Sequence, residues 1–283
     1  MNEMSEKAIR EFWDAHPCGE SQMEGLSSDY EDFFRRYDAF RYQREAHILR
    51  RLDAIDFKGK QVLEIGLGQG ADSEQIIRRG AIWSGVDISA ESVDRVSTRL
   101  RCRGLDHARL ECASALDLPF PDDRFDIVFA HGVLHHIPDV LTAQKEIARV
   151  LKPEGRLIAM LYARRSLNYL LAISVVRRLS LAVLVLGRAK PAGIIGDHIA
   201  GAKRMGLSEY LRMRNFIHRN TDGPLNPYSK VYDLATVHQD FPAFTLDTHS
   251  QEYMHAPPLP VFWLKPFARV LGWHLWVHLN PRK

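Results

Sequence analysis

The chain has 283 residues, of which 46% are hydrophobic and 26% are charged, and its formal net charge is +3. This composition is ordinary for a globular protein and excludes a disordered, collagen-like or disulfide-scaffold chain, while the length favours one α/β core with added segments. The net charge hides an asymmetry, because residues 1–56 hold 13 acidic and 8 basic residues whereas residues 163–196 hold 6 basic residues and no acidic ones.

The sequence offers few signals of export or of a membrane anchor. Cys18, Cys102 and Cys112 occur without CxxC spacing, which favours neither a disulfide framework nor a zinc site, so we expect a cytoplasmic protein. The polar N-terminus does not resemble a secretory signal. The longest unbroken apolar run, residues 181–186, is far shorter than the ~20 residues that span a bilayer, and we therefore expect no membrane-spanning helix.

The first 162 residues divide into two parts. Residues 1–58 are typical of acidic helices joined by loops and form a candidate helical cap. From residue 59 short apolar runs alternate with amphipathic segments, and helices are expected over 71–79, 91–103 and 139–151; the apolar runs are QVLEIG, AIWSGVDI, ARLECA, FDIVFA and GRLIAMLY. This alternation predicts an α/β core over 59–162, a doubly wound, mostly parallel sheet with helices on both faces.

Beyond residue 162 the alternation stops. Residues 163–230 are predicted to form a helical insertion with an apolar face, made of Leu167, Leu170, Leu171, Val175, Leu179, Ala182, Val183 and Leu186. Residues 231–283 contain a further helix and the strand-like segments FTLDTHSQEYM and GWHLWVHL. We expect these two strands to complete the sheet as an antiparallel pair.

A glycine-rich turn is the first functional candidate. The segment EIGLGQG, residues 64–70, follows an apolar strand and precedes a helix, as a cofactor-binding loop does. The same string also satisfies the dinucleotide pattern, and a merely tight turn is the plain alternative. Asp87 ends the next strand, where a carboxylate accepts both hydroxyl hydrogens of a ribose, in a nicotinamide cofactor as in others. Capping of the following helix is its structural alternative, although Ser89 is the better cap.

A downstream segment resembles a known family. Residues 115–139, ALDLPFPDDRFDIVFAHGVLHHIPD, together with VLEIGLGQG and GVDIS, resemble the class I S-adenosylmethionine-dependent methyltransferases of the small-molecule and lipid branch. The motifs occur in the family's order over about residues 60–162. The resemblance implies a Rossmann-like seven-stranded fold, with S-adenosyl-L-methionine as cofactor. A catalytically idle protein that binds this cofactor or a partner is the alternative, and a nicotinamide oxidoreductase is disfavoured.

The resemblance assigns the methionine and ribose ends of the cofactor to five positions. Gly66, Gly68 and Gly70 would line the methionine side, and Glu64 would hold its amino group directly or through water. Asp87 would bind the ribose hydroxyls.

Five further positions would contact the adenine ring and the methyl group. Ile88 would pack on the adenine. The family often has an aspartate after the third strand, and here Ser114 stands in its place, which leaves the backbone of Ala115 and the side chain of Leu116 to frame the ring. His131 would face the transferred methyl group.

Methyl transfer from a sulfonium is an in-line displacement that needs positioning and desolvation, and a base only if the acceptor must lose a proton. His131 and His135 are the candidate catalytic residues, because histidine accepts a proton near neutral pH, and His136 is a lesser one. The alternative is that this segment shapes the loop, with Asp139 near the start of the next helix. No further ligand stands at metal-binding spacing, so no metal is expected.

The acceptor would bind outside the cofactor core. The N-terminal segments FWDAHPCGE and FFRRYDAFRYQREAH resemble the capping region of some bacterial members of the branch. Trp13, His16, Tyr37 and Tyr42 are candidate acceptor-binding residues, and ordinary packing of a helix pair is their alternative. Cys18 is expected to be a loop or pocket residue rather than a nucleophile.

Two basic segments bear on the choice of partner. Residues 163–196 combine an apolar face with basic residues, and residues 253–283 add aromatic and basic residues without an acidic one. Together they favour a small-molecule or lipid-like acceptor and a peripheral contact with an anionic membrane. A soluble small molecule is equally compatible, each stretch alone resembles a core helix with solvated arginines, and no nucleic-acid partner is expected.

Overall fold

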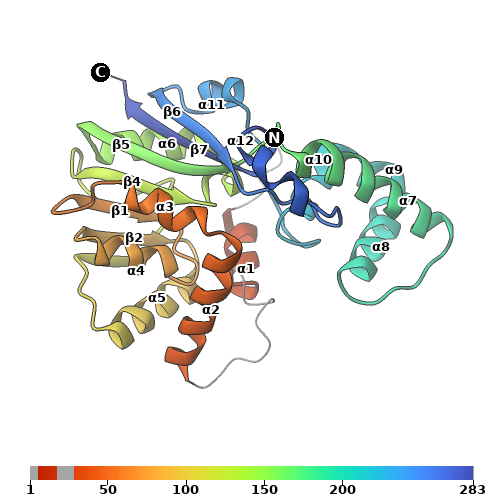
Figure 1. The fold of residues 1–283 in the computed structure, drawn as a ribbon, viewed down its shortest axis with the longest axis horizontal. Helices are drawn as coiled ribbons and strands as arrows, with labels where there is room; N and C mark the ends of the chain where they lie inside the picture. The colour runs from red at the N-terminus through yellow and green to blue at the C-terminus, as the bar shows by residue number, and fades with distance from the viewer. Residues whose placement is uncertain (1–5, 18–28, 283) are drawn as a thin grey trace.

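The computed structural model describes residues 6–17 and 29–282. Its centre is a seven-stranded sheet of strand order β3-β2-β1-β4-β5-β7-β6, drawn in Figure 1. The strands are β1 (Gln61–Ile65), β2 (Ile82–Asp87), β3 (Arg109–Cys112), β4 (Phe125–His131), β5 (Leu151–Tyr162), β6 (Phe244–Glu252) and β7 (His274–Pro281). The first five run parallel, and β7 lies antiparallel between β5 and β6. The predicted doubly wound sheet and its terminal antiparallel pair are confirmed.

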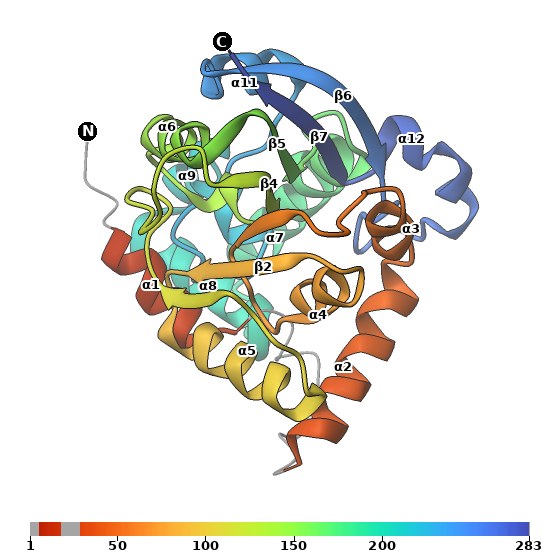
Figure 2. The same cartoon turned by 90° about the vertical axis from the view of Figure 1, so that its left-hand side faces the viewer.

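Helices cover both faces of this sheet. The helices α3 (His47–Asp53), α4 (Ala71–Arg78) and α5 (Ala90–Arg103) pack on one face, and α6 (Val140–Val150) and α11 (Leu234–Asp240) pack on the other. Figure 2 shows α6 and the pair α3 and α4 on opposite sides of the strands. Burial on both faces explains why the central strands are continuous apolar runs rather than alternating ones.

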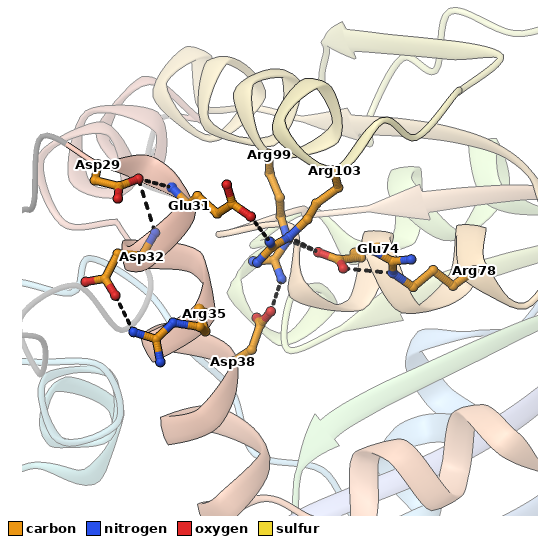
Figure 3. A network of polar contacts seen from close by, with 9 residues as sticks. All are labelled: Asp29, Glu31, Asp32, Arg35, Asp38, Glu74, Arg78, Arg99 and Arg103. Atoms are coloured by element: carbon orange, nitrogen blue, oxygen red, sulfur yellow. Dashed lines mark hydrogen bonds and ion pairs between the residues drawn. The ribbon is translucent and has the colours of Figure 1, made fainter.

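Helix α2 (Tyr30–Arg44), which with α1 (Glu6–Ala15) belongs to the predicted cap, is joined to the core by buried charge. Arg99 on α5 is fully buried and donates to Asp38 on α2, to Glu74 on α4 over 2.9 Å, and to the carbonyl of Gln69 over 3.2 Å. Its guanidinium also lies 5.0 Å from the ring centre of Phe34. Figure 3 shows these charges meeting between α2, α4 and α5. One arginine therefore joins the cap to the end of the glycine loop.

The insertion forms its own helical cluster beyond one end of the sheet (Figure 1). A π-helical stretch, η3 (Asn168–Arg177), continues into α7 (Arg178–Leu186), and α8 (Gly193–Met205), α9 (Leu207–Tyr210) and α10 (Met213–Phe216) follow. Most of the predicted apolar face of this helix faces solvent: Leu170, Leu179, Val183 and Leu186 are 52, 63, 69 and 75% exposed. The helix packs on its neighbours through another face, which contains Ile173 and Leu181.

Residues 168–186 form one helix of 19 residues with a mean hydropathy of 2.0, which is long and apolar enough to cross a membrane by length and composition alone. The length of unbroken apolar runs did not indicate this helix, because Arg177 and Arg178 interrupt the apolar residues at its middle while its mean hydropathy stays high. Cys18 lies outside the described residues, and Cys102 and Cys112 are exposed free thiols.

Candidate functional site

The loop between β1 and α4 is built around positive backbone angles. Gly66, Gly68 and Gly70 have φ of 77°, 51° and 73°, a region that residues with a Cβ rarely adopt. A Cβ on Gly66 would also lie 2.1 Å from Cγ2 of Val133. Glycine at position 66 is therefore required both by its conformation and by the close approach of the segment after β4.

A cavity of about 200 Å³, here called the loop cavity, opens beside this turn. Its walls are the glycine loop, the ends of β2 and β4, residues 113–116 and helix α1. Eight of the ten sequence-predicted cofactor residues line it: Gly66, Gly68, Asp87, Ile88, Ser114, Ala115, Leu116 and His131. Ile9 and Trp13 of α1 close one side, so the cap helix forms part of the same cavity.

Asp87 is a fixed acceptor in the wall of the loop cavity. Its carboxylate accepts hydrogen bonds from the backbone N–H groups of Leu67 at 2.7 Å, Gly68 at 3.4 Å and Ser89 at 2.9 Å. Burial raises the pKa of Asp87, and these N–H groups oppose the rise. Ser89, rather than Asp87, caps α5 by accepting from the N–H of Ser92. Oδ2 accepts from both Leu67 and Gly68, whereas Oδ1 accepts from Ser89 alone and retains acceptor capacity.

Two predicted cofactor residues do not line the loop cavity. Gly70 is the residue preceding the first turn of α4. Glu64 is 2% exposed and accepts a hydrogen bond of 2.8 Å from Nε1 of Trp83 on the neighbouring strand. Burial raises the pKa of Glu64 to about 8. The carboxyl group of Glu64 is thus hydrogen-bonded to Trp83 and does not line the loop cavity.

A second cavity of about 260 Å³, here called the cap cavity, lies between α2, the ends of β4 and β5, the start of β7 and residues 253–255. Trp13, His131 and Gly132 line both this cavity and the loop cavity. Tyr37, a predicted acceptor residue, lines it as well. Its other walls are aromatic and charged: Phe40, Arg41, Arg44, Glu45, Tyr162, Asp222, Tyr253, His255, Trp273 and His274. The two cavities therefore meet at His131.

His131 is held by a charged group that the sequence motifs did not indicate. Its Nδ1 lies 2.6 Å from Oδ2 of Asp72, and Nη2 of Arg41 donates to that same oxygen over 2.7 Å. Burial opposes ionisation of Asp72, but Arg41 and His131 hold its pKa well below the usual range. An ionised carboxylate only accepts, so Nδ1 of His131 carries a hydrogen toward Asp72, and Nη2 of Arg41 lies 3.1 Å from the same nitrogen. In the neutral form of this tautomer Nε2 is the acceptor.

The neighbouring histidines have other surroundings. His135 is fully buried, its ring centre lies 3.8 Å from that of Tyr162, and neither ring nitrogen has a hydrogen-bond partner within residues 6–17 and 29–282. Burial lowers the pKa of His135 far below its ordinary value. His135 lines none of the cavities described, so the structure gives it a packing position. His136 lines the loop cavity and donates from Nδ1 to the carbonyl of Tyr228 over 2.8 Å.

Two of the residues predicted to bind the methyl acceptor lie away from both cavities. His16 is exposed, and its Nδ1 contacts the carbonyl of Phe12 at 3.0 Å, as a residue at a helix end does. The hydroxyl of Tyr42 donates to Asp72 over 3.4 Å, so Tyr42 contacts the carboxylate behind His131 instead of the cavity. Amphipathic pattern alone gave no means of separating these residues from Trp13 and Tyr37.

A histidine pair lies next to His131. Nε2 of His47 and Nδ1 of His274 are 3.0 Å apart, and the rings of His131 and His274 meet edge to face at 6.0 Å. Burial lowers the pKa of His47 to about 3 and that of His274 well below its ordinary value, so both rings are neutral. In the described part of the chain, no three His, Cys, Asp or Glu side chains are arranged to hold a metal ion.

Comparisons with known proteins agree with this geometry. Residues 63–159 match the family model described as a methyltransferase domain. The chain is 38% identical over 98 residues to the uncharacterized methyltransferase YcgJ of Bacillus subtilis, which covers 35% of this chain and 39% of that protein. It is 34% identical over 113 residues to the chloroplastic tocopherol O-methyltransferase of Arabidopsis thaliana, covering 39% of this chain and 32% of the relative. The matches thus span less than half of either relative.

A solved structure shows that the likeness extends through the fold. Magnesium protoporphyrin IX methyltransferase from Synechocystis PCC 6803, determined with bound SAH, aligns with 98% of this chain and 99% of its own at a TM-score of 0.54 and 13% sequence identity. At that identity the likeness concerns the fold alone. Residues 63–159 therefore match a methyltransferase domain in sequence, and the glycine loop and the central strands lie within that part of a chain whose fold is that of solved methyltransferases.

Proposed function

We propose that this protein transfers a methyl group from S-adenosylmethionine to a small-molecule acceptor, and that His131 takes the proton which the acceptor loses. The observation that carries the proposal is the position of His131 in the walls of both cavities, with Asp72 fixing the hydrogen on Nδ1. The loop cavity would hold the cofactor and the cap cavity the acceptor, so that methyl donor, acceptor and base meet at one point.

The residues of the loop cavity fit this cofactor. Gly66 and Gly68 leave the backbone uncovered where a methionine chain would pass, and Asp87 presents acceptor oxygens to a ribose. Ser114 and Leu116 form the wall where an adenine would lie. When bound, S-adenosylmethionine supplies an electrophilic methyl carbon. Glu64 would reach the amino group only through water or after leaving Trp83, since it does not line the cavity.

The chain's own residues would assist in three ways. Ile9 and Trp13 of α1 exclude water from the loop cavity, which strengthens the electrostatic interactions inside it. Nε2 of His131 accepts the proton from an acceptor hydroxyl or amine, a contribution of ~10²–10⁴-fold when the geometry is correct. The ionised Asp72 stabilises the resulting imidazolium, and Arg41 keeps Asp72 ionised.

We also propose a lipophilic acceptor and a membrane-facing insertion. The support is the outward apolar side of residues 168–186, together with exposed aromatic residues in η5 (Phe262–Phe267), where Phe262 and Trp263 are 63 and 81% exposed. The tocopherol enzyme among the relatives has a lipophilic phenol in its name. Sedimentation with anionic liposomes tests the membrane contact: we expect pelleting that Trp263→Ser and Leu179→Ser weaken, and absence of pelleting by the intact protein would refute it.

Direct binding measurements test the cofactor assignment. We expect calorimetry to show binding of S-adenosylhomocysteine and none of NAD. Asp87→Ala should weaken that affinity at least tenfold, because charge-assisted hydrogen bonding to the ribose would be lost together with the acceptor that fixes the N–H groups of Leu67 and Gly68. An intact protein that binds NAD in preference, or neither compound, would overturn the methyltransferase proposal, and an Asp87→Ala variant of unchanged affinity would remove Asp87 from the ribose site.

A methyl-transfer assay tests the catalytic part. With labelled S-adenosylmethionine and an extract of candidate acceptors, we expect His131→Gln to reduce turnover about 10²-fold or more while S-adenosylhomocysteine still binds. His135→Asn is the comparison at a histidine that lines neither cavity. Equal turnover by His131→Gln and the parent protein would show that no base is required at this position.

A further inference from the structure

A third cavity lies inside the insertion, apart from the loop cavity that would hold the cofactor. This insertion groove has a volume of about 520 Å³ and runs between η3, α7, α8, residues 216–223 and the segment Pro257–Pro258. Its walls are mainly apolar, with Leu181, Leu184, Ile194, Ile195 and Phe216 among the lining residues. Ile194 and Ile195 are 65 and 50% exposed and lie where the groove meets the surface. The shape and lining suit an aliphatic or isoprenoid chain.

Two guanidinium groups in these apolar walls lack a matching negative charge. Arg177 donates to the carbonyls of Pro257, at 2.7 and 2.9 Å, and of Asn220, at 2.7 Å. Arg219 donates to the carbonyl of Asn215 at 2.6 Å and lies 5.5 Å from the ring centre of Tyr210. Burial lowers the pKa of both arginines.

Neither group is neutralised by the protein. Among the described residues, no carboxylate forms an ion pair with Arg177 or Arg219, whereas Arg149 and Arg99 elsewhere in the chain are each paired with acidic side chains. Backbone carbonyls fix the position of the Arg177 guanidinium but leave its charge uncompensated. Half-buried cations beside an apolar groove are an arrangement that favours an anionic group on the ligand.

The insertion groove and the cap cavity share part of their walls. Thr221 lines both, and the residues on either side of it divide between them, with Asn220 in the groove and Asp222 in the cap cavity. Residues 253–258 also contribute to both walls, since His255 lines the cap cavity and Pro257 lines the groove. Because Arg177 donates to both Asn220 and Pro257, its guanidinium lies at this junction.

We propose that the methyl acceptor is an acidic lipid: its chain occupies the insertion groove, its carboxylate or phosphate binds Arg177 and Arg219, and its reacting group enters the cap cavity beside His131. This inference rests on the proposed methyltransferase function and specifies the acceptor class. It would place the residues that select the acceptor on the insertion, outside the cofactor core.

Binding of simple amphiphiles tests the groove without knowledge of the natural acceptor. The probes are laurate, dodecyl phosphate, dodecanol and dodecylamine, each below its micelle concentration and measured by calorimetry. We expect laurate or dodecyl phosphate to bind at least tenfold more tightly than dodecanol, and dodecylamine to bind most weakly. The ratio between laurate and dodecyl phosphate distinguishes a carboxylate from a phosphate ligand. Equal binding of the acid, alcohol and amine would overturn the anionic part of the proposal.

Matched variants locate the binding. Arg177→Gln and Arg219→Gln should each weaken the tighter acidic probe at least tenfold, and Arg219→Gln carries the test if loss of the Arg177 bonds prevents folding. Arg178→Gln is the control, because Arg178 neighbours Arg177 but does not line the groove. Ile195→Ser should weaken all chain-bearing probes, with the exposed Leu186→Ser as its control. Unchanged affinities in Arg219→Gln and Ile195→Ser would place the probes elsewhere and refute the groove.

Two further readouts separate this inference from the proposed function. S-adenosylhomocysteine should bind whether or not laurate is present; if it binds and the acidic probes do not, the methyltransferase proposal stands and the acidic-lipid proposal fails. If the probes bind and S-adenosylhomocysteine does not, the methyltransferase proposal fails, and with it the claim that the lipid is an acceptor. With an extract and labelled cofactor, we expect label in the acidic lipid fraction. Arg219→Gln should change the KM for the lipid acceptor more than it changes kcat. Label confined to water-soluble products would overturn the proposed acceptor class.

Discussion

Gly66→Ala is the substitution whose outcome follows most directly from the geometry of the loop. Gly66 has φ +77° and Gly59, in the turn before β1, has φ +70°, so alanine at either position meets the same backbone strain of ~1–2 kcal/mol. Their surroundings differ: a Cβ at Gly59 has no atom within 4 Å, whereas one at Gly66 lies 2.1, 2.9 and 3.0 Å from Cγ2, Cγ1 and Cβ of Val133.

Rotation of the Val133 side chain does not relieve this overlap. All three of its carbons beyond Cα are too close to the added Cβ, and the side chain packs against the main core cluster. The backbone of the loop or of the segment after β4 must therefore move, and overpacking of this kind costs a further ~1–3 kcal/mol. We expect Gly59→Ala to destabilise the protein by ~1–2 kcal/mol and Gly66→Ala by about 2–5 kcal/mol.

Urea denaturation and calorimetry with S-adenosylhomocysteine measure the two consequences. Gly59→Ala should keep its ligand affinity, and Gly66→Ala should lose it because the moved loop narrows the loop cavity. In a Val133→Ala background, the destabilisation caused by Gly66→Ala should be smaller, which a double-mutant cycle reports as a coupling energy. If Gly66→Ala proves no more harmful than Gly59→Ala, or if the cycle shows no coupling, the steric argument is wrong.

Three other substitutions examine the buried charges. Asp72→Asn should lower kcat/KM, measured by steady-state kinetics, by about 10²-fold or more, because Asp72 orients His131. The affinity for S-adenosylhomocysteine should stay the same, since Asp72 does not line the loop cavity. An equal loss of that affinity would contradict this role of Asp72. Glu64 has a folded pKa of about 8, above its unfolded value, so its contribution to stability is complete below about pH 4.5 and is lost as the pH rises through 8. The unfolding midpoint should therefore fall between pH 6 and pH 9 by more in the parent protein than in Glu64→Gln. The same fall in both proteins would argue against a protonated Glu64. Arg99→Met should cost ~3–5 kcal/mol because it leaves Glu74 and Asp38 without their buried partner, whereas the exposed pair of Arg35 with Asp32 is worth at most ~1 kcal/mol. Similar denaturation midpoints for Arg99→Met and Arg35→Met would show that Arg99 does not join α2 to α4.

The sequence was most informative where burial and backbone conformation leave one solution. The parallel strands were predictable because a strand covered on both faces is a continuous apolar run, as in residues 61–65 and 125–131. The glycine loop was predictable because its positive φ angles demand glycine. Asp87 was predictable because it ends a strand at the edge where parallel strands meet a ligand.

The contacts that orient His131 were not predictable, because they join residues that no local period relates. Arg41 and Asp72 are 31 positions apart, and Asp72 and His131 are 59 apart. The partner of Glu64 was hidden for the same reason, since Trp83 reads as an ordinary strand residue until strand register places it nearby. In the insertion, period showed that residues 167–186 are apolar at helical spacing but not which side would meet other helices, because several sides of that helix are apolar.

The antiparallel course of β7 has a consequence for biosynthesis. Tyr162 at the end of β5 pairs with His274 at the start of β7, and β6 contacts the sheet only through β7. While residues 274–281 are still within the ribosome, the nascent chain has an unpaired β5 edge and a detached β6, a state in which strand edges are prone to wrong pairing. The wall that Trp273 and His274 give to the cap cavity forms only after that, so a translating chain can complete its loop cavity before its cap cavity.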